Sequence, residues 1–168
     1  MTTLRLAFWL VVGLACLSTV NAWMTPPAVP KVYWHNWADS AGVSHLTECS
    51  LTNWTFVDFL PNSDPLYLDN VVSGDSASVV WMQLPVGWKG PFHKDPVPQL
   101  VLFMSGEGTW ETMDNKTHVF TVGQVYFGED QRSLLGHISA NTGNSPLIMA
   151  LLQFKGWQPT VNQPCRLK

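Results

Sequence analysis

Charged side chains are scarce in this sequence, and the basic ones form no cluster. Asp, Glu, Lys and Arg make up 12% of the 168 residues, and the net charge at pH 7 is −3. Nucleic acids and anionic membranes are bound mainly through grouped Lys and Arg side chains. The composition therefore argues against both as partners, and a small molecule or a carbohydrate is the expected ligand.

Three catalytic motifs are also absent. The sequence contains no glycine-rich phosphate loop, no Cys-x-x-Cys pair and no Gly-x-Ser-x-Gly elbow. Each of these motifs holds its reactive groups at a fixed spacing, and they carry nucleotide binding, structural zinc and serine-hydrolase chemistry. Those functions therefore have no support in the sequence.

The longest uninterrupted apolar run lies near the N-terminus. It covers Leu6–Leu17, follows a single basic residue, and precedes the small residues Val20 and Ala22. This arrangement is typical of a signal peptide cleaved near Ala22. A membrane anchor is the alternative, but a spanning helix needs about 18 apolar residues, more than this run supplies. We therefore expect residues 1–22 to be removed and the mature chain to be secreted, with no membrane span.

Only three cysteines occur, and Cys16 lies in the expected signal peptide. In an oxidising compartment the other two, Cys49 and Cys165, most simply form one disulfide. The loop that it closes is long, so the restriction of the unfolded chain would stabilise the fold by roughly 4–5 kcal/mol. Two buried free thiols are the alternative.

Two glycosylation sequons agree with secretion. They begin at Asn53 and Asn115, and each has a threonine two residues later. A sequon is an acceptor when it lies in an exposed turn of a secreted chain. Asn115 follows Asp114 at a predicted hairpin turn, whereas Asn53 borders an apolar run, so Asn115 is the stronger candidate.

Helical periodicity is missing over any window of about twelve residues, so helices should be few and short, with one turn expected at Asp39–Val43. Short apolar or alternating segments, separated by Gly, Pro, Asn and Asp, instead predict strands. The expected strands are Lys31–Trp37, Thr55–Leu60, Leu66–Val72, Ala77–Leu84, Leu100–Met104, Thr109–Met113, His118–Val122, Gln124–Phe127, His137–Asn141 and Leu147–Phe154.

This pattern predicts a single all-β domain, a small antiparallel β-barrel or jelly roll. Turn residues at 105–108 and 114–116 divide three consecutive strands, as in the centre of a closed sheet. We expect an extended N-terminal arm with outer strands at 23–74, the barrel core at 75–154, and a C-terminal tail at 155–168.

Four side chains capable of binding a metal are expected to meet inside this barrel. His93 and Asp95 are two residues apart, so they share one face of an extended segment. Gln99 follows across two prolines, which should bend the chain back, and His137 arrives from a distant segment. A structural role is the alternative for each: a histidine bonded to backbone, a turn acceptor, or a capping amide.

The spacing of these residues resembles that of the cupin superfamily. The first cupin motif is matched in register by Gly87, His93, Asp95, Gln99 and Gly106, and the His-x-x-x-Asn end of the second is matched by His137 and Asn141. The resemblance covers residues 75–154 and extends to small bacterial single-domain cupins. It implies a double-stranded β-helix that holds a divalent metal (Fe, Mn, Zn or Cu) through His93, Asp95, Gln99 and His137.

Two positions depart from the usual cupin ligands. Asp95 stands where a histidine is usual, and Gln99 stands where a glutamate is usual. With His93 and His137, Asp95 would give the two-histidine, one-carboxylate set of non-haem iron oxygenases. Gln99 is neutral, so it would be a weaker fourth ligand or a group that supports the others.

Other polar and aromatic residues are expected near the barrel mouth. Glu129 and Asp130 are interpreted as a solvated turn, the alternatives being a general acid or base or a replacement ligand. Trp81 and Tyr126 are candidates for the lining of a ligand pocket, although such aromatics are more often core residues.

Two functions follow. The first is a secreted cupin that binds a divalent metal and a small molecule, with oxygenase, isomerase or lyase activity implied by the resemblance. The second is a non-enzymatic extracellular glycoprotein that binds carbohydrate or matrix through a barrel that has lost its metal. The resemblance also admits a homodimer, since cupins often pair through outer strands.

Overall fold

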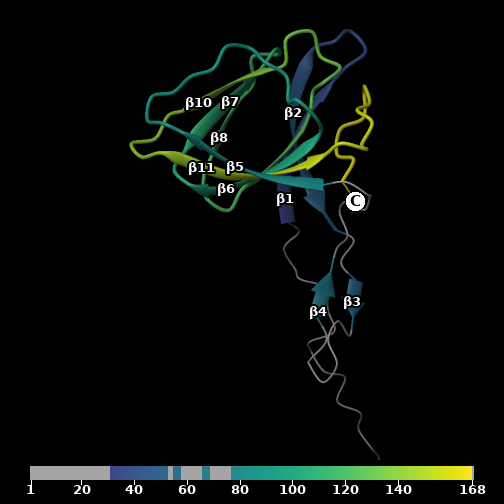
Figure 1. Cartoon of the computed structure of the whole chain (residues 1–168). Helices are drawn as coiled ribbons and strands as arrows, with labels where there is room; N and C mark the ends of the chain where they lie inside the picture. Colours follow the sequence, from purple (N-terminus) through teal and green to yellow (C-terminus); the bar gives the residue numbers. More distant parts are fainter. Residues whose placement is uncertain (1–30, 53–54, 58–65, 69–76, 168) are drawn as a thin grey trace, which may run out of the picture.

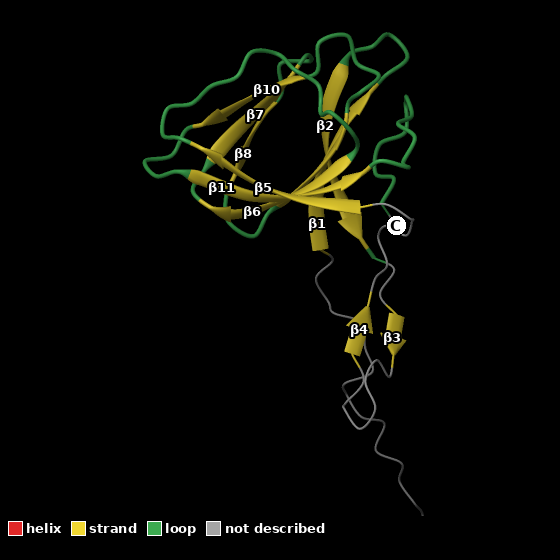
Figure 2. Cartoon of the chain, viewed as in Figure 1, coloured by secondary structure: helices red, strands yellow, loops and turns green. Residues whose placement is uncertain are grey.

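A computed structural model describes residues 31–52, 55–57, 66–68 and 77–167, and within these residues all regular structure is β (Figures 1 and 2). No helix of this part of the chain is long and apolar enough to cross a membrane. The strands are β1 Lys31–Ala38, β2 Ser44–Leu51, β3 Thr55–Val57, β4 Leu66–Leu68, β5 Ala77–Leu84, β6 Gln99–Ser105, β7 Gly108–Thr112, β8 Thr117–Phe120, β9 Val125–Glu129, β10 His137–Asn141 and β11 Leu147–Phe154.

Two main sheets form a jelly roll, as the strand pattern predicts. Six strands pair in the order β2-β1-β9-β6-β11-β5, three pair in the order β10-β7-β8, and β3 and β4 form a separate hairpin. The two main sheets face each other across an apolar core. Phe103 of β6 stacks on Phe120 of β8 with ring centroids 4.6 Å apart, and Trp110 of β7 meets the same pair edge-on. The all-β fold class is confirmed.

The N-terminal strands belong to the main sheet. β1 pairs with β2 on one side and runs parallel to β9 on the other, so it lies inside the six-stranded sheet. β2 was absent from the expected strands because its buried positions include Ser44, whose hydroxyl is satisfied by the Gly136 carbonyl. The turn expected as helical at Asp39–Val43 is instead the β1–β2 hairpin turn, with Gly42 at φ 80°.

The six-stranded sheet buries side chains on both faces. One face packs into the barrel, and the other carries a second apolar cluster of Tyr33, Cys49, Leu100, Phe127, Phe154 and Leu167. Successive side chains of a strand point to opposite faces, which places Leu100 and Val101 in different clusters. Because Leu167 lies in the second cluster, the C-terminal tail is the cover of this outer face.

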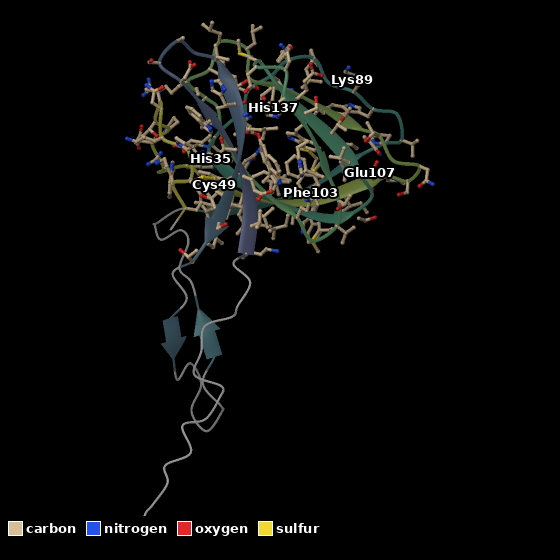
Figure 3. All side chains as sticks on the ribbon, turned by 180° about the vertical axis from the view of Figure 1, so that it is seen from behind. His35, Cys49, Lys89, Phe103, Glu107 and His137 are labelled. Carbon is tan, nitrogen blue, oxygen red and sulfur yellow. A yellow bond between two sulfur atoms is a disulfide. The ribbon has the colours of Figure 1, made fainter. Side chains whose placement is uncertain are left out.

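Several polar contacts hold the tail on the sheet. The predicted disulfide joins Cys49 to Cys165 with Cα atoms 5.3 Å apart. The backbone amide of Cys165 donates to Nδ1 of His35 at 2.9 Å, and the amide of Leu167 donates to the Tyr33 hydroxyl at 3.1 Å. Figure 3 shows His35 and Cys49 on the side where the tail lies, with Phe103 inside the barrel.

Of the two sequons and the expected signal peptide, the structure describes only the sequon at Asn115. Asn115 is exposed in the β7–β8 turn with φ 62°, a conformation that asparagine tolerates. Its glycosylation stays a prediction that this exposure permits. Residues 1–30, which include the expected signal peptide, and Asn53 lie outside the described residues.

Loss of the disulfide should destabilise the fold strongly. The two cysteines are 116 residues apart in sequence, so the cross-link removes much of the entropy of the unfolded chain. We expect the double variant Cys49→Ser, Cys165→Ser to lose roughly 4–5 kcal/mol of unfolding free energy, measured by urea denaturation. Reduction of the wild type should have the same effect. Two free thiols in the native protein, by intact mass, would contradict this pairing.

Candidate metal and ligand site

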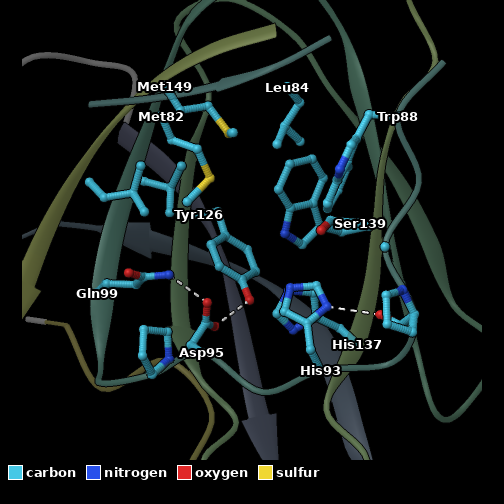
Figure 4. Close-up of a pocket in the computed structure, with 16 residues that line it drawn as sticks. Met82, Leu84, Trp88, His93, Asp95, Gln99, Tyr126, His137, Ser139 and Met149 are labelled. Carbon is cyan, nitrogen blue, oxygen red and sulfur yellow. Dashed lines mark hydrogen bonds between the residues drawn. The ribbon is translucent and has the colours of Figure 1, made fainter. Parts of the chain in front are cut away.

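A cavity of about 430 Å³ lies between the two sheets (Figure 4). Most of its wall is apolar, and its polar groups gather at one end, where the residues predicted as metal ligands lie. The apolar lining includes Met82, Leu84, Trp88, Val101, Trp110 and Met149, and the polar lining includes His93, Asp95, Gln99, His137 and Ser139.

The two histidines predicted to meet are neighbours across a short backbone bridge. The amide of each donates to the carbonyl of the other, at 2.9 Å from His93 and 2.8 Å from His137, and the ring centroids are 4.6 Å apart. Gly136 permits this approach, since a Cβ there would lie 2.0 Å from the carbonyl oxygen of His93. The spatial expectation that placed these two rings together is met.

Both histidine rings are held through Nδ1. His93 Nδ1 lies 2.9 Å from the carbonyl oxygen of Pro91, and His137 Nδ1 lies 2.7 Å from Oδ2 of Asp130. These oxygens only accept hydrogen bonds, so Nδ1 carries the proton and the neutral ring has its lone pair on Nε2. Histidines that bind metal are usually oriented in this way.

Asp95 is buried at the polar end of the cavity. It accepts hydrogen bonds from Gln99 Nε2 at 2.5 Å and from the Tyr126 hydroxyl at 2.7 Å (Figure 4). Burial, together with the negative charge of Asp130, raises the pKa of Asp95 to about 6, although His137 and the two hydrogen bonds oppose the rise. Gln99 receives a hydrogen bond on Oε1 from Gln153 at 3.0 Å, so its amide is committed to orienting Asp95.

Asp130 is part of the site, and the prediction of a solvated turn for it is wrong. Its side chain is 0% exposed and contacts His137 and the backbone amide of Asp95, the latter at 2.9 Å. Ligand atoms of Asp95, Asp130 and His137 lie within 4.8 Å of one another, close enough to share a metal ion. The sequence hides this because a polar pair after a strand reads as a loop, whereas β9 ends inside the barrel.

Glu129 is also buried, but on the opposite face of the sheet. Its carboxylate pairs with Arg166 of the tail and lies 3.2 Å from Nε2 of His35. It also accepts hydrogen bonds from the indole of Trp157 and the amide of Thr160, both at 3.1 Å. Glu129 is therefore a structural anchor for the tail, and its neighbour Asp130 serves the cavity.

Asn36 of β1 joins the separate parts of the site. Its Nδ2 group donates to the Tyr126 hydroxyl at 2.9 Å and to Oδ2 of Asp130 at 3.0 Å. Burial acts to lower the pKa of His137, but the charges of Asp95 and Asp130 outweigh it, so the pKa is raised. No local sequence signal marks Asn36, because only the parallel pairing of β1 with β9 brings it to the cavity.

Of the two aromatic residues predicted to line the pocket, one does so and the other does not. Tyr126 lies in the cavity and is fully buried, and burial holds the pKa of its hydroxyl well above the ordinary value, so the group stays a donor. Trp81 is 67% exposed on β5 and does not line the cavity. The reason is its position in the strand, since its neighbour Met82 takes the inward-facing place.

No family model matches the sequence, and no curated protein matches it. Similar solved structures include a cupin domain from Bordetella pertussis, 18% identical with a TM-score of 0.39, which covers 51% of this chain and 88% of that one. A cupin 2 conserved barrel domain protein from Leptotrichia buccalis is 21% identical with a TM-score of 0.37, covering 50% of this chain and 38% of that one.

A DMSP lyase from Ruegeria pomeroyi is 18% identical with a TM-score of 0.39, and the match covers 66% of this chain and 52% of the lyase. At this level of likeness neither activity nor ligand is transferred. The motif register, the jelly-roll sheets and the convergence of His93 with His137 agree with one another. The protein has an all-β jelly-roll fold, and the spacing of its motif residues resembles that of cupins. Within this barrel, Asp130 and Asn36 join the four residues that the motifs identified.

The fit of Asp95 should depend on Gly128, which pairs with Gln99 across the sheet. A Cβ at Gly128 would lie 1.9 Å from Oδ2 of Asp95, so Gly128→Ala must displace the carboxylate. We expect a loss of about 1–3 kcal/mol of unfolding free energy in urea, as for other overpacked cores. Gly156→Ala is the matched control, because a Cβ there meets nothing within 4 Å. Equal stability of the two variants would count against the packing described.

The raised pKa of Asp95 predicts a pH dependence of stability in the presence of a chelator. Its folded pKa of about 6 exceeds the unfolded value of about 3.9, so the folded state binds the proton more tightly and gains stability as pH falls through 6. Asp95→Asn lacks this titration. The Tm of the wild type should therefore rise relative to that of Asp95→Asn between pH 7.5 and pH 5. If the Tm of the wild type minus the Tm of Asp95→Asn stays constant or falls as the pH is lowered, the assignment is refuted.

Proposed function

We propose that this cupin-type barrel binds a divalent metal ion and a small molecule in its cavity. The ion would be held by Asp95, Asp130 and His137, which requires that the proton between Nδ1 of His137 and Asp130 be released when the ion binds, and His93 lies beside them. The observation that carries the proposal is the convergence of two carboxylates and an imidazole, all buried, from three separate segments.

The chemistry of the donor set supports a metal. Two buried carboxylates close to each other are unfavourable unless a positive charge or hydrogen bonds compensate them. Among the residues that the structure describes, no Lys or Arg lines the cavity. Carboxylate and imidazole ligands suit Fe, Mn, Zn and Cu. A bound ion would supply a Lewis acid, while Tyr126 and Gln99 orient Asp95.

The wider proposal includes secretion and, by the cupin resemblance, a reaction. Cleavage near Ala22, glycosylation at Asn53 and Asn115, and the disulfide together suit an extracellular protein. One similar solved structure is that of a lyase, but a fold does not decide among oxygenase, isomerase and lyase activities.

A metal-free binding protein is the second candidate, and one observation favours it. Both oxygens of Asp95 already accept hydrogen bonds, and the pKa of His137 is raised by its two acidic neighbours. An imidazolium at His137 would offset part of their charge without a metal. This candidate keeps the ligand-binding cavity and gives up Lewis-acid chemistry.

Metal analysis separates the two candidates. The native, purified protein should contain near-stoichiometric metal, and Asp130→Asn and His137→Gln should lose most of it. Asp114→Asn, outside the cavity, is the matched control and should retain the ion. Circular dichroism checks that each variant is folded. A wild type that stays metal-free after incubation with Fe(II), Mn(II), Zn(II) and Cu(II), and whose Tm a chelator leaves unchanged, would overturn the metal site.

A further inference from the structure

Two hydrogen-bond donors, Ser139 and Trp110, stand side by side in the cavity wall. Ser139 of β10 and Trp110 of β7 are directly opposite each other in the antiparallel register. Opposite residues of paired strands project from the same face, with Cβ atoms about 5 Å apart. Both line the cavity, and they are only 4% and 5% exposed.

Neither donor is used within the part of the chain that the structure describes. No hydrogen bond there engages the Ser139 hydroxyl or the Trp110 indole N–H, whereas the Tyr126 hydroxyl and both ends of the Gln99 amide are engaged. An indole N–H can only donate, and both residues line the cavity, where a bound molecule can reach them. An oxygen atom of a bound molecule would satisfy both groups at once.

The charge of the cavity disfavours an anionic ligand. Its polar end carries Asp95, with Asp130 in contact, and its described lining contains no Lys or Arg. The two carboxylates would balance a divalent ion, so a metal-loaded cavity offers an anion no net positive charge. An anion would therefore lose its hydration without gaining a charged partner.

The rest of the cavity lining favours a ligand whose surface is mostly apolar. Trp88 presents an aromatic ring, and Met82 and Met149 present adaptable thioethers (Figure 4). Trp110 adds a second indole to the lining. A volume of about 430 Å³ lies in the range of small-molecule sites.

We infer that the cavity takes a neutral, largely apolar molecule of one or two rings, whose carbonyl or hydroxyl oxygen accepts hydrogen bonds from Ser139 and Trp110. The inference rests on the proposed function in treating the cavity as the binding site, and it names the class of ligand. The exclusion of anions holds with or without a bound ion, and the exclusion of cations holds when a divalent ion balances the two carboxylates.

A set of matched probes tests the charge preference. 2-Phenylethanol, phenylacetate and 2-phenylethylammonium share a ring and chain length and differ in charge. Their dissociation constants should be measured by ligand-observed NMR on the full mature protein, with zinc and separately with a chelator. We expect 2-phenylethanol to bind at least about tenfold more tightly than phenylacetate in both conditions, because the anion lacks a charged partner.

Variants of the two donors test the oxygen site. Ser139→Ala should raise the dissociation constant of 2-phenylethanol by about 3- to 10-fold. The dissociation constant of ethylbenzene, which has no oxygen, should not change. Trp110→Phe keeps a ring and removes the N–H, so it gives a second reading if Ser139→Ala misfolds. Ser145→Ala, on the exposed β10–β11 turn, is the control.

The outcomes distinguish the inference from the proposed function. Phenylacetate binding as tightly as the alcohol, or equal losses for 2-phenylethanol and ethylbenzene in both variants, would overturn the inference while ligand binding stands. Failure of every probe to bind would overturn the cavity as a binding site. The metal result is independent of both.

Discussion

The alternation of side chains along β9 is the constraint on which the rest of the structure depends. Phe127 and Glu129 point to the outer face, where they meet the C-terminal tail, while Tyr126, Gly128 and the following Asp130 face the cavity. The strand lies between β1 and β6, so its register is fixed on both sides. One short segment therefore anchors the tail and builds the site at once, and a shift of one residue would exchange the two roles.

At the polar end of the cavity, hydrogen-bond donors partly compensate the cost of burying two carboxylates. Asp95 and Asp130 are removed from water. The described part of the chain offers them amide, phenol and imidazole donors but no Lys or Arg in the cavity lining. This deficit of positive charge underlies both the proposed metal site and the discrimination against anionic ligands. The apolar remainder of the wall, with two unused donors, sets the complementary preference for a neutral molecule.

The strand pattern and the main motif residues could be predicted from sequence because their signals are local. Period-two alternation and turn residues indicated most strands, and the spacing of His93, Asp95, Gln99 and His137 indicated one site. β2 was missed because its buried serine is polar, and Asp130 was misjudged because a carboxylate after a strand looks solvated. Their burial depends on partners distant in sequence, Gly136 for Ser44 and Asn36 and Asp95 for Asp130, which no local window contains.

The sequence by itself determined the all-β class, the pairing of Cys49 with Cys165 and the cupin-type spacing. Composition, cysteine number and residue intervals can all be read from the linear sequence without knowledge of the fold. The tertiary structure alone decided that Asn36 and Asp130 join the cavity, that Gln99 orients Asp95, and that Trp81 faces solvent. The physical reason is that burial and hydrogen bonding are properties of neighbours in space, and strand order in the sheet selects those neighbours.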